Sequence, residues 1–271
     1  MGTYRFSWSS PDFYSEYVRN GDYPDVDALY KYRSWNNPLH RKLLTDCVVF
    51  MAPPDSFEDS FDCRAPEDFP TLIELLNLFY QKSFEHLPPS ATKYDRFLFV
   101  LKLLRESPLV HKEKRDKLSQ EIYKEFCHRF GVLSLTADPY NDIMWEKYAD
   151  NHGGICIGYD KEFLEKYVGG AGPVVYTNNL PHVRYFVDDV MIQHFKNTFF
   201  KEMRWRFEKE YRMFKLWDQN VSEDERNIHI PNEAIVEIIL GSQMSEENLN
   251  AICNIAAAKY PDAKIKREST I

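Results

Sequence analysis

The chain has 271 residues, 44% of them apolar and 15% aromatic, and is long enough to bury a substantial core in one large α+β domain. Its 34 basic and 42 acidic residues give a net charge of -8, which argues against a broad phosphate-binding surface. No apolar run approaches the ~20 residues that span a bilayer, and the N-terminus lacks the apolar stretch of a signal peptide. We therefore expect a cytoplasmic protein with no membrane partner.

Cysteine and histidine usage gives no sign of a metal or disulfide framework. The five cysteines are scattered without a C-x-x-C pair, and the eight histidines are equally dispersed. This pattern is typical of reduced core thiols and predicts no transition-metal site.

The N-terminal third of the chain predicts an arm, two strands and a turn. Residues 10–24 mix aromatic and acidic side chains around prolines and predict an N-terminal arm. Ala28–Arg33 alternates and is rich in tyrosine, which predicts the first core strand, with its lysine and arginine on one face and its tyrosines on the other. A second strand is predicted at Cys47–Met51, before an acidic, aromatic turn at Phe57–Cys63.

The spacing of apolar residues then becomes helical. Residues 71–130 predict a helical insertion within a single α+β domain that covers 1–271. Three prolines separate its helices: Pro88, Pro89 and Pro108.

The remaining chain predicts a return to strands. We expect strands at 131–136, 153–159, 174–176 and 208–217, a turn at 169–173, and helices at 143–149 and 187–203. A C-terminal α/β unit follows, with strands at 235–240 and 263–266 around a helix at 245–259.

The segment Trp205–Arg212 concentrates charged and aromatic residues. If it is extended, Glu208, Glu210 and Arg212 share one face. Adjacent carboxylates raise each other's pKa and an arginine lowers both, as in sites for cationic or hydroxyl-rich substrates. The more common structural alternative is an amphipathic edge strand with its polar face in water.

Four motifs together resemble a bacterial family described only as a domain of unknown function. They are a Leu-Tyr-Lys-Tyr-Arg strand, a Phe-x-Asp-x-Phe-Asp turn, a Met-Trp-x-x-Tyr motif before His-x-Gly, and Trp-x-x-Glu-x-Glu-x-Arg, found here at Leu29–Arg33, Phe57–Asp62, Met144–Gly154 and Trp205–Arg212. The final strand at Ile238–Gly241 also fits, whereas Glu58 and Ser60 replace the usual Asn and Pro.

The order of these motifs is similar to the layout of ADP-ribosyltransferases and, distantly, of transferase toxins. That resemblance implies a mixed, mostly antiparallel central sheet of the split ADP-ribosyltransferase type. It implies Glu210 as the catalytic residue, with Glu208 completing the Glu-x-Glu pattern. It also implies NAD as substrate, held by these cofactor-binding residues: Arg33, Tyr32, Ser134 (or Thr136), Trp145, Tyr148 and Arg212.

The function implied by this resemblance is cleavage of NAD and transfer of ADP-ribose to a protein or nucleic-acid acceptor. A toxin or phage-defence role, with an antitoxin or regulatory partner, would be consistent with it.

Two alternatives stay open. One is a metal-dependent nuclease or phosphohydrolase whose oxygen ligands are Asp59, Asp62, Glu208 and Glu210. The other is a non-catalytic binding module with a buried ion-pair network among Arg33, Glu208, Glu210 and Arg212. An open cleft at these residues would favour an enzyme, and a solid salt-bridged core would favour the module.

Overall fold

A seven-stranded sheet forms the centre of the protein. The computed structural model describes residues 26–268, so the predicted arm at 10–24 lies outside the described residues. The strand order is β13-β12-β5-β1-β4-β10-β6, and every pair is antiparallel except β12 with β13. The strands are β1 (Ala28–Arg33), β4 (Phe130–Thr136), β5 (Ile155–Asp160), β6 (Gly170–Pro173), β10 (Glu210–Leu216), β12 (Ile235–Leu240) and β13 (Lys264–Arg267). The predicted mixed, mostly antiparallel sheet is confirmed.

Three short pairs accompany this sheet. They are β2 (Val48–Phe50) with β11 (Asn227–His229), β3 (Glu67–Asp68) with β8 (Val183–Arg184), and β7 (Val175–Thr177) with β9 (Phe200–Glu202). Short 3-10 helices lie between them at η1 (Pro54–Ser56), η2 (Pro108–Val110), η3 (Met203–Glu208), η4 (Asp224–Arg226) and η5 (Asn232–Ala234).

Helices cover both faces of the central sheet. Buried side chains of α2 (Pro38–Thr45), α7 (Lys161–Val168) and α9 (Glu246–Lys259) join the strands in the main apolar core. On the other face, α6 (Asp142–Tyr148) packs Trp145 against Tyr32 of β1 in a second cluster. Asn141 caps the start of α6, where its side chain accepts a hydrogen bond from the backbone of Met144.

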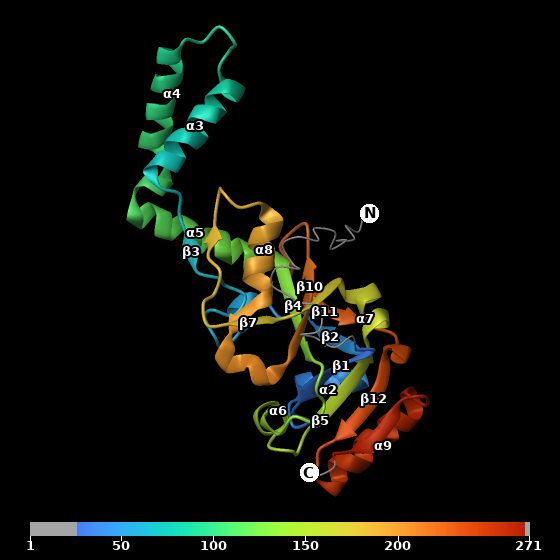
Figure 1. Cartoon of the computed structure of the whole chain (residues 1–271). Coiled ribbons are helices and arrows are strands. Elements are labelled where there is room, and N and C mark those ends of the chain that lie inside the picture. Colours follow the sequence, from blue (N-terminus) through green and yellow to red (C-terminus); the bar gives the residue numbers. More distant parts are fainter. Residues whose placement is uncertain (1–25, 269–271) are drawn as a thin grey trace.

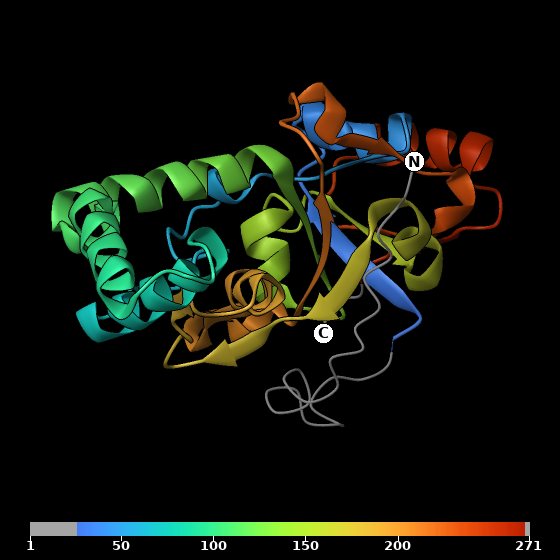
Figure 2. The same cartoon turned by 90° about the horizontal axis from the view of Figure 1, so that it is seen from above.

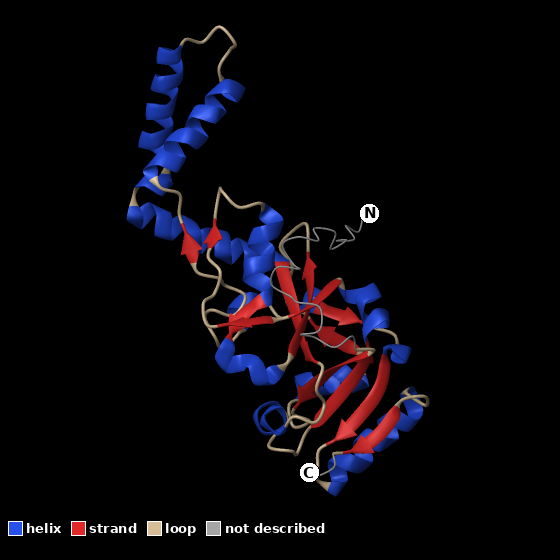
Figure 3. Ribbon diagram, in the orientation of Figure 1, coloured by secondary structure: helices blue, strands red, loops and turns tan. Residues whose placement is uncertain are grey.

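Three further helices form an arm that extends away from the sheet (Figures 1 and 3). They are α3 (Leu72–His86), α4 (Lys93–Glu106) and α5 (Lys112–Arg129), close to the predicted limits. Thr71 and Thr92 start α3 and α4 with complete capping boxes. Seen from above, the arm leaves the sheet on one side, opposite α9 (Figure 2). None of the described helices is long and apolar enough to cross a bilayer.

Three predictions about the second half of the chain are wrong in detail. The predicted turn at 169–173 contains strand β6, which pairs with β10, so β10 is an inner strand and not an edge. The predicted helix at 187–203 is shorter, because α8 covers only Val190–Phe199 before the chain extends into β9. Glu208 ends the 3-10 helix η3 and is not part of the strand.

The sheet opens along the line between β1 and β4. These strands share one residue pair, Tyr30 with Thr136, whereas β1 and β5 share six and β4 and β10 share seven. Four residues before Thr136, Val132 pairs instead with Ala52, after strand β2. The β1-facing edge of β4 therefore has a gap at Ser134, where the Lys31 ammonium donates a hydrogen bond to the Ser134 carbonyl.

Candidate active site between strands β1 and β4

A pocket of about 300 Å³ lies at this gap. Its walls come from β1, β4, α6, the loop at 52–62 and the segment 201–210. Four of the predicted cofactor-binding residues border it, together with both predicted catalytic carboxylates: Arg33, Tyr32, Ser134, Tyr148, Glu208 and Glu210. Segments far apart in the sequence thus bring most of the predicted site together.

The β1 wall carries two cations without acidic partners. Within the described chain, Lys31 donates only to the Ser134 carbonyl and Arg33 only to the Tyr32 carbonyl, at 3.3 Å. Burial lowers the pKa of the Arg33 guanidinium to about 10. Burial, with Arg33 nearby, also holds the pKa of Lys31 well below its usual range. Two desolvated cations facing a cavity favour an anionic ligand there.

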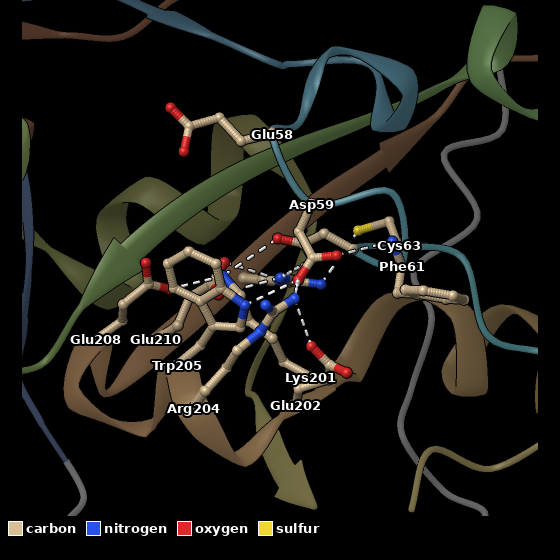
Figure 4. Close-up of polar contacts among 12 residues, drawn as sticks. Glu58, Asp59, Phe61, Cys63, Lys201, Glu202, Arg204, Trp205, Glu208 and Glu210 are labelled. Atoms are coloured by element: carbon tan, nitrogen blue, oxygen red, sulfur yellow. Dashed lines mark hydrogen bonds and ion pairs between the residues drawn. The ribbon is translucent and has the colours of Figure 1, made fainter. Parts of the chain in front are cut away.

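The opposite wall is a cluster of three buried carboxylates around one ammonium. Lys201 of β9 lies 3.1 Å from Asp62, 2.6 Å from Glu208 and 2.9 Å from Glu210, measured from its Nζ to the carboxylate oxygens. Burial alone would lower the pKa of Lys201, but the surrounding carboxylates, Glu210 first, raise it above its usual range. Figure 4 draws Lys201 with Glu208 and Glu210 in the lower half of the close-up.

Arg212 lies behind this cluster and is fully buried. Its Nε and Nη2 donate to the two oxygens of Glu210 at 2.8 and 3.0 Å, and Nη2 also reaches Asp62. Its Nη1 donates to the Thr198 carbonyl at 2.6 Å and lies 3.1 Å from the Cys63 sulfur. Since it does not border the pocket, Arg212 holds carboxylates in place and has no direct access to a ligand.

The two glutamates differ in how many partners they have. Glu210 accepts one hydrogen bond from Lys201 and two from Arg212. Glu208 accepts from Lys201 and, at 2.6 Å, from the Tyr148 hydroxyl. An ionised carboxylate has about four acceptor positions. Glu210 therefore has one more filled position than Glu208, which has about two positions left for a ligand.

A left-handed residue brings these two glutamates together. Lys209 has φ 42° and ψ 48°, and links the end of η3 to the start of β10. Glu208 and Glu210 consequently reach the same ammonium, although only Glu210 belongs to the strand. The predicted edge strand with a solvated polar face is also wrong, because Glu208, Glu210 and Arg212 are all buried.

Trp205 borders the pocket and contacts several charged side chains. The Trp205 indole donates to Asp59 at 2.8 Å, and Arg204 donates to the same carboxylate oxygen at 2.9 Å. Lys147 of α6 lies 4.1 Å from the centre of the Trp205 ring. In Figure 4 the Trp205 ring lies beside Asp59, whereas Glu58 points away from the cluster.

Trp145, predicted to contact the ligand, does not border the pocket. It has no exposed surface, donates to the Pro139 carbonyl at 3.1 Å, and meets the Tyr32 ring edge-on at 5.1 Å between ring centres. Its role is to support Tyr32. Lys201 and Lys31 are pocket residues that the sequence interpretation did not identify, although each is a lone lysine among aromatic residues, at Phe199-Phe200-Lys201 and Tyr30-Lys31-Tyr32.

The carboxylates that we considered as magnesium ligands already have protein cations as partners. Asp59 pairs with Arg204, while Asp62, Glu208 and Glu210 surround Lys201. Among the described residues, no group of three His, Cys, Asp or Glu side chains is placed to hold a metal ion. The ammonium occupies the centre that a divalent cation would need, which counts against the metal-dependent hydrolase.

Comparisons with known proteins add no assignment. No protein-family model, curated protein or solved structure matches the chain. The function must therefore be argued from the pocket.

Proposed function

We propose that this protein is an ADP-ribosyltransferase-like enzyme that binds NAD in the pocket between β1 and β4 and cleaves its nicotinamide–ribose bond. The observation that carries the proposal is the pairing of two opposite walls. One wall holds two cations that form no ion pair with a carboxylate of residues 26–268, and the other holds a fixed carboxylate pair with a tyrosine hydroxyl. A dinucleotide has the matching groups, an anionic pyrophosphate and ribose hydroxyls beside a cationic ring.

Arg33 and Lys31 would hold the pyrophosphate. Arginine forms paired hydrogen bonds with phosphate oxygens, and a partly buried lysine adds a point charge. Arg33 loses water on folding without forming an ion pair among the described residues, and the charges of Glu210 and Glu208 offset the burial of Lys31 only in part, so a bound phosphate would restore the interaction that burial removed.

Glu208 would accept a hydroxyl of the nicotinamide ribose, because it has acceptor positions left. Glu210, held by Arg212 and Lys201, would contribute a fixed negative charge to the same region. When the C–N bond breaks, nicotinamide leaves with the electron pair and the ribose carbon becomes cationic. A carboxylate held nearby stabilises charge that exists only in the transition state.

The pocket has room for part of the dinucleotide. Its volume of about 300 Å³ is at the lower end of the ~300–1,000 Å³ typical of ligand sites. The nicotinamide riboside end would lie near Tyr148 and Trp205, whose rings border the pocket, and the rest of NAD would extend through the mouth. The acceptor, a protein, a nucleic acid or water, would attack the ribose carbon from that opening.

A non-catalytic binding module is the second candidate. It is favoured by the buried network of Arg212, Lys201 and their carboxylates, which has the character of a structural ion-pair core. The pocket in front of that network is what makes the enzyme our first choice.

The experiment that tests the proposal is nicotinamide release from NAD by the purified protein, with and without total cell protein and nucleic acid. Glu208→Gln should lower the rate by roughly 100-fold or more, since it removes a charge that stabilises the transition state. Glu146→Gln is the matched control, because Glu146 is exposed on α6 and does not border the pocket. Absence of release under every condition would reject NAD cleavage and favour the binding module.

A further inference from the structure

The α3–α4 hairpin exposes a row of large apolar side chains along each helix. On α3, Ile73 is 71% exposed, Leu76 36%, Tyr80 39% and Phe84 54%. On α4, Tyr94 is 66% exposed, Phe97 53%, Leu98 45% and Leu101 44%. Each row repeats at three- to four-residue intervals, which is the spacing of one helix face. We call these eight residues the hairpin stripe.

The hairpin stripe lies beside the contact between the two helices, and Phe84 touches both, because the buried Arg96 guanidinium of α4 lies 4.0 Å from the centre of its ring. That contact is made by Leu75 and Phe79 of α3 with Val100 of α4, all buried. Successive residues of a helix are turned by 100° about its axis. Viewed from its N-terminus, the exposed row of α3 lies to one side of Leu75 and Phe79. The exposed row of α4, viewed from its own N-terminus, lies to the same side of Val100. Because the two helices run antiparallel, equal rotations place both rows on the same face of the hairpin.

This face is too apolar to be ordinary surface. The eight side chains, each with a total area of about 150–250 Å² and roughly half exposed, leave about 800 Å² of apolar surface. Monomeric proteins rarely expose contiguous apolar patches of that size. A standard protein interface buries about 800 Å² on each partner.

We infer that the hairpin stripe binds the hairpin stripe of a second copy of this chain, so that two α3–α4 hairpins form an antiparallel four-helix bundle. Two antiparallel helices with one apolar face are half of such a bundle, and a two-fold axis makes the face its own complement. The charged residue that lies against the stripe, Arg96, is itself buried, so the exposed surface of the stripe is apolar and a second stripe offers the matching surface. The arm also extends beyond the sheet, which leaves room for two molecules to meet there (Figure 1).

The test is the mass of the full-length protein in solution, measured by light scattering during size-exclusion chromatography. We expect twice the chain mass of 32.2 kDa. The variant Ile73→Asp/Tyr80→Asp should raise the dimer dissociation constant by roughly 100-fold, because each change places a charge in an apolar interface. The control Lys82→Glu makes the same total change of two negative charges and should remain a dimer, because Lys82 is exposed and lies on the side of α3 away from the stripe, two positions (about 200°) around the helix from Tyr80.

Circular dichroism of each variant verifies that α3 and α4 remain folded. If the aspartate variant unfolds, the milder pair Ile73→Ser/Leu98→Ser replaces it, with the same expected direction. A wild-type mass of one chain at about 100 μM, or an aspartate variant that stays dimeric as tightly as the control, would overturn the inference. This test does not depend on the NAD proposal, because the stripe and the pocket have no residue in common.

Discussion

Arg212 is a buried cation outside the pocket that fixes two of the pocket's carboxylates. It has no exposed surface and fixes Glu210 and Asp62 through its Nε and Nη2 groups. Removing one partner of a buried ion pair leaves the remaining charge without compensation. The pocket wall therefore depends on a residue that a ligand cannot reach.

Replacing Arg212 with methionine should cost about 3–5 kcal/mol of unfolding free energy, since the three buried carboxylates Asp62, Glu208 and Glu210 would be left with Lys201 as their one buried cation. Urea unfolding measures this loss. Arg204→Met is the control: the Arg204 side chain is 62% exposed, and its buried partner Asp59 would keep the hydrogen bonds donated by the Trp205 indole and the Phe61 backbone. That variant should lose no more than about 1 kcal/mol. Equal losses in the two variants would contradict the role assigned to Arg212.

The same cluster makes stability depend on acid. Burial alone would raise the pKa of Glu210, but the charges of Arg212 and Lys201 outweigh it and hold the pKa well below its usual range. A lowered folded-state pKa adds stability that is complete above the unfolded value of about 4.3 and is lost as the pH falls below it. Wild-type unfolding free energy should decline below about pH 5, and Glu210→Gln should flatten that decline. An unchanged slope in the variant would show that other carboxylates cause it.

At the scale of elements, close contact at the end of β1 sets the position of Arg33. A Cβ atom on Gly154 would lie 2.4 Å from the Arg33 carbonyl oxygen and 2.9 Å from the backbone of Ala149. Neither neighbour is a flexible side chain that can move aside. Gly154 is therefore required where the end of β1 packs against the loop before β5.

Gly154→Ala should lower the unfolding free energy by about 1–3 kcal/mol, as overpacking does, and should weaken NAD binding by displacing Arg33. Thermal unfolding and a titration with NAD would measure the two effects. Gly153→Ala is the neighbouring control, because its nearest atom would be 3.0 Å away and the next 3.6 Å. If Gly154→Ala weakened NAD binding no more than Gly153→Ala does, the position of Arg33 would not be the cause of the weakening.

Most elements could be predicted from the sequence because their signals are local. Tyrosine alternation marked β1 at its observed limits, and prolines marked the ends of α3 and α4. β6 was missed because Gly-Ala-Gly-Pro has the composition of a turn, and only its pairing with β10 makes it a strand. A neighbouring strand cannot be read from the segment itself.

The site was predicted in part for the same reason. The Glu-x-Glu-x-Arg motif located Glu208 and Glu210, but assumed an extended chain where Lys209 is left-handed. Lys201 could not be found from spacing, because its three carboxylates come from two distant segments, one around Asp62 and one at 208–210. Trp145 is a residue type that often contacts ligands, but the packing of α6 places it against the Tyr32 ring and away from the pocket.

At the scale of the whole molecule, the protein has two unequal apolar cores. The main core joins the sheet to α2, α7 and α9, whereas the α3–α4 hairpin has its own small cluster around Leu75, Phe79 and Val100. Regions with few buried apolar contacts open at lower free energy than the global transition. The hairpin and the sheet should therefore differ in local stability.

Native-state hydrogen exchange tests this difference. Amides of α3 and α4 should exchange through openings that cost less free energy than those of β5 and β12, whose side chains lie in the main core. Measuring at several protein concentrations separates protection by the hairpin's own contacts from protection by a second copy. Exchange of all four elements at one common free energy would mean that the arm and the sheet unfold as a single unit.

Because β1 and β4 share a single residue pair, backbone pairing connects the two halves of the sheet at one position. A molecule bound in the gap would contact both halves of the sheet and add a second connection between them. Occupancy would then be visible as resistance to heat, because a ligand that binds only the folded state adds about 2.7 kcal/mol at 100 times its dissociation constant. The melting temperature of the protein is thus a direct reporter for screening nucleotides, independent of whether any of them is turned over.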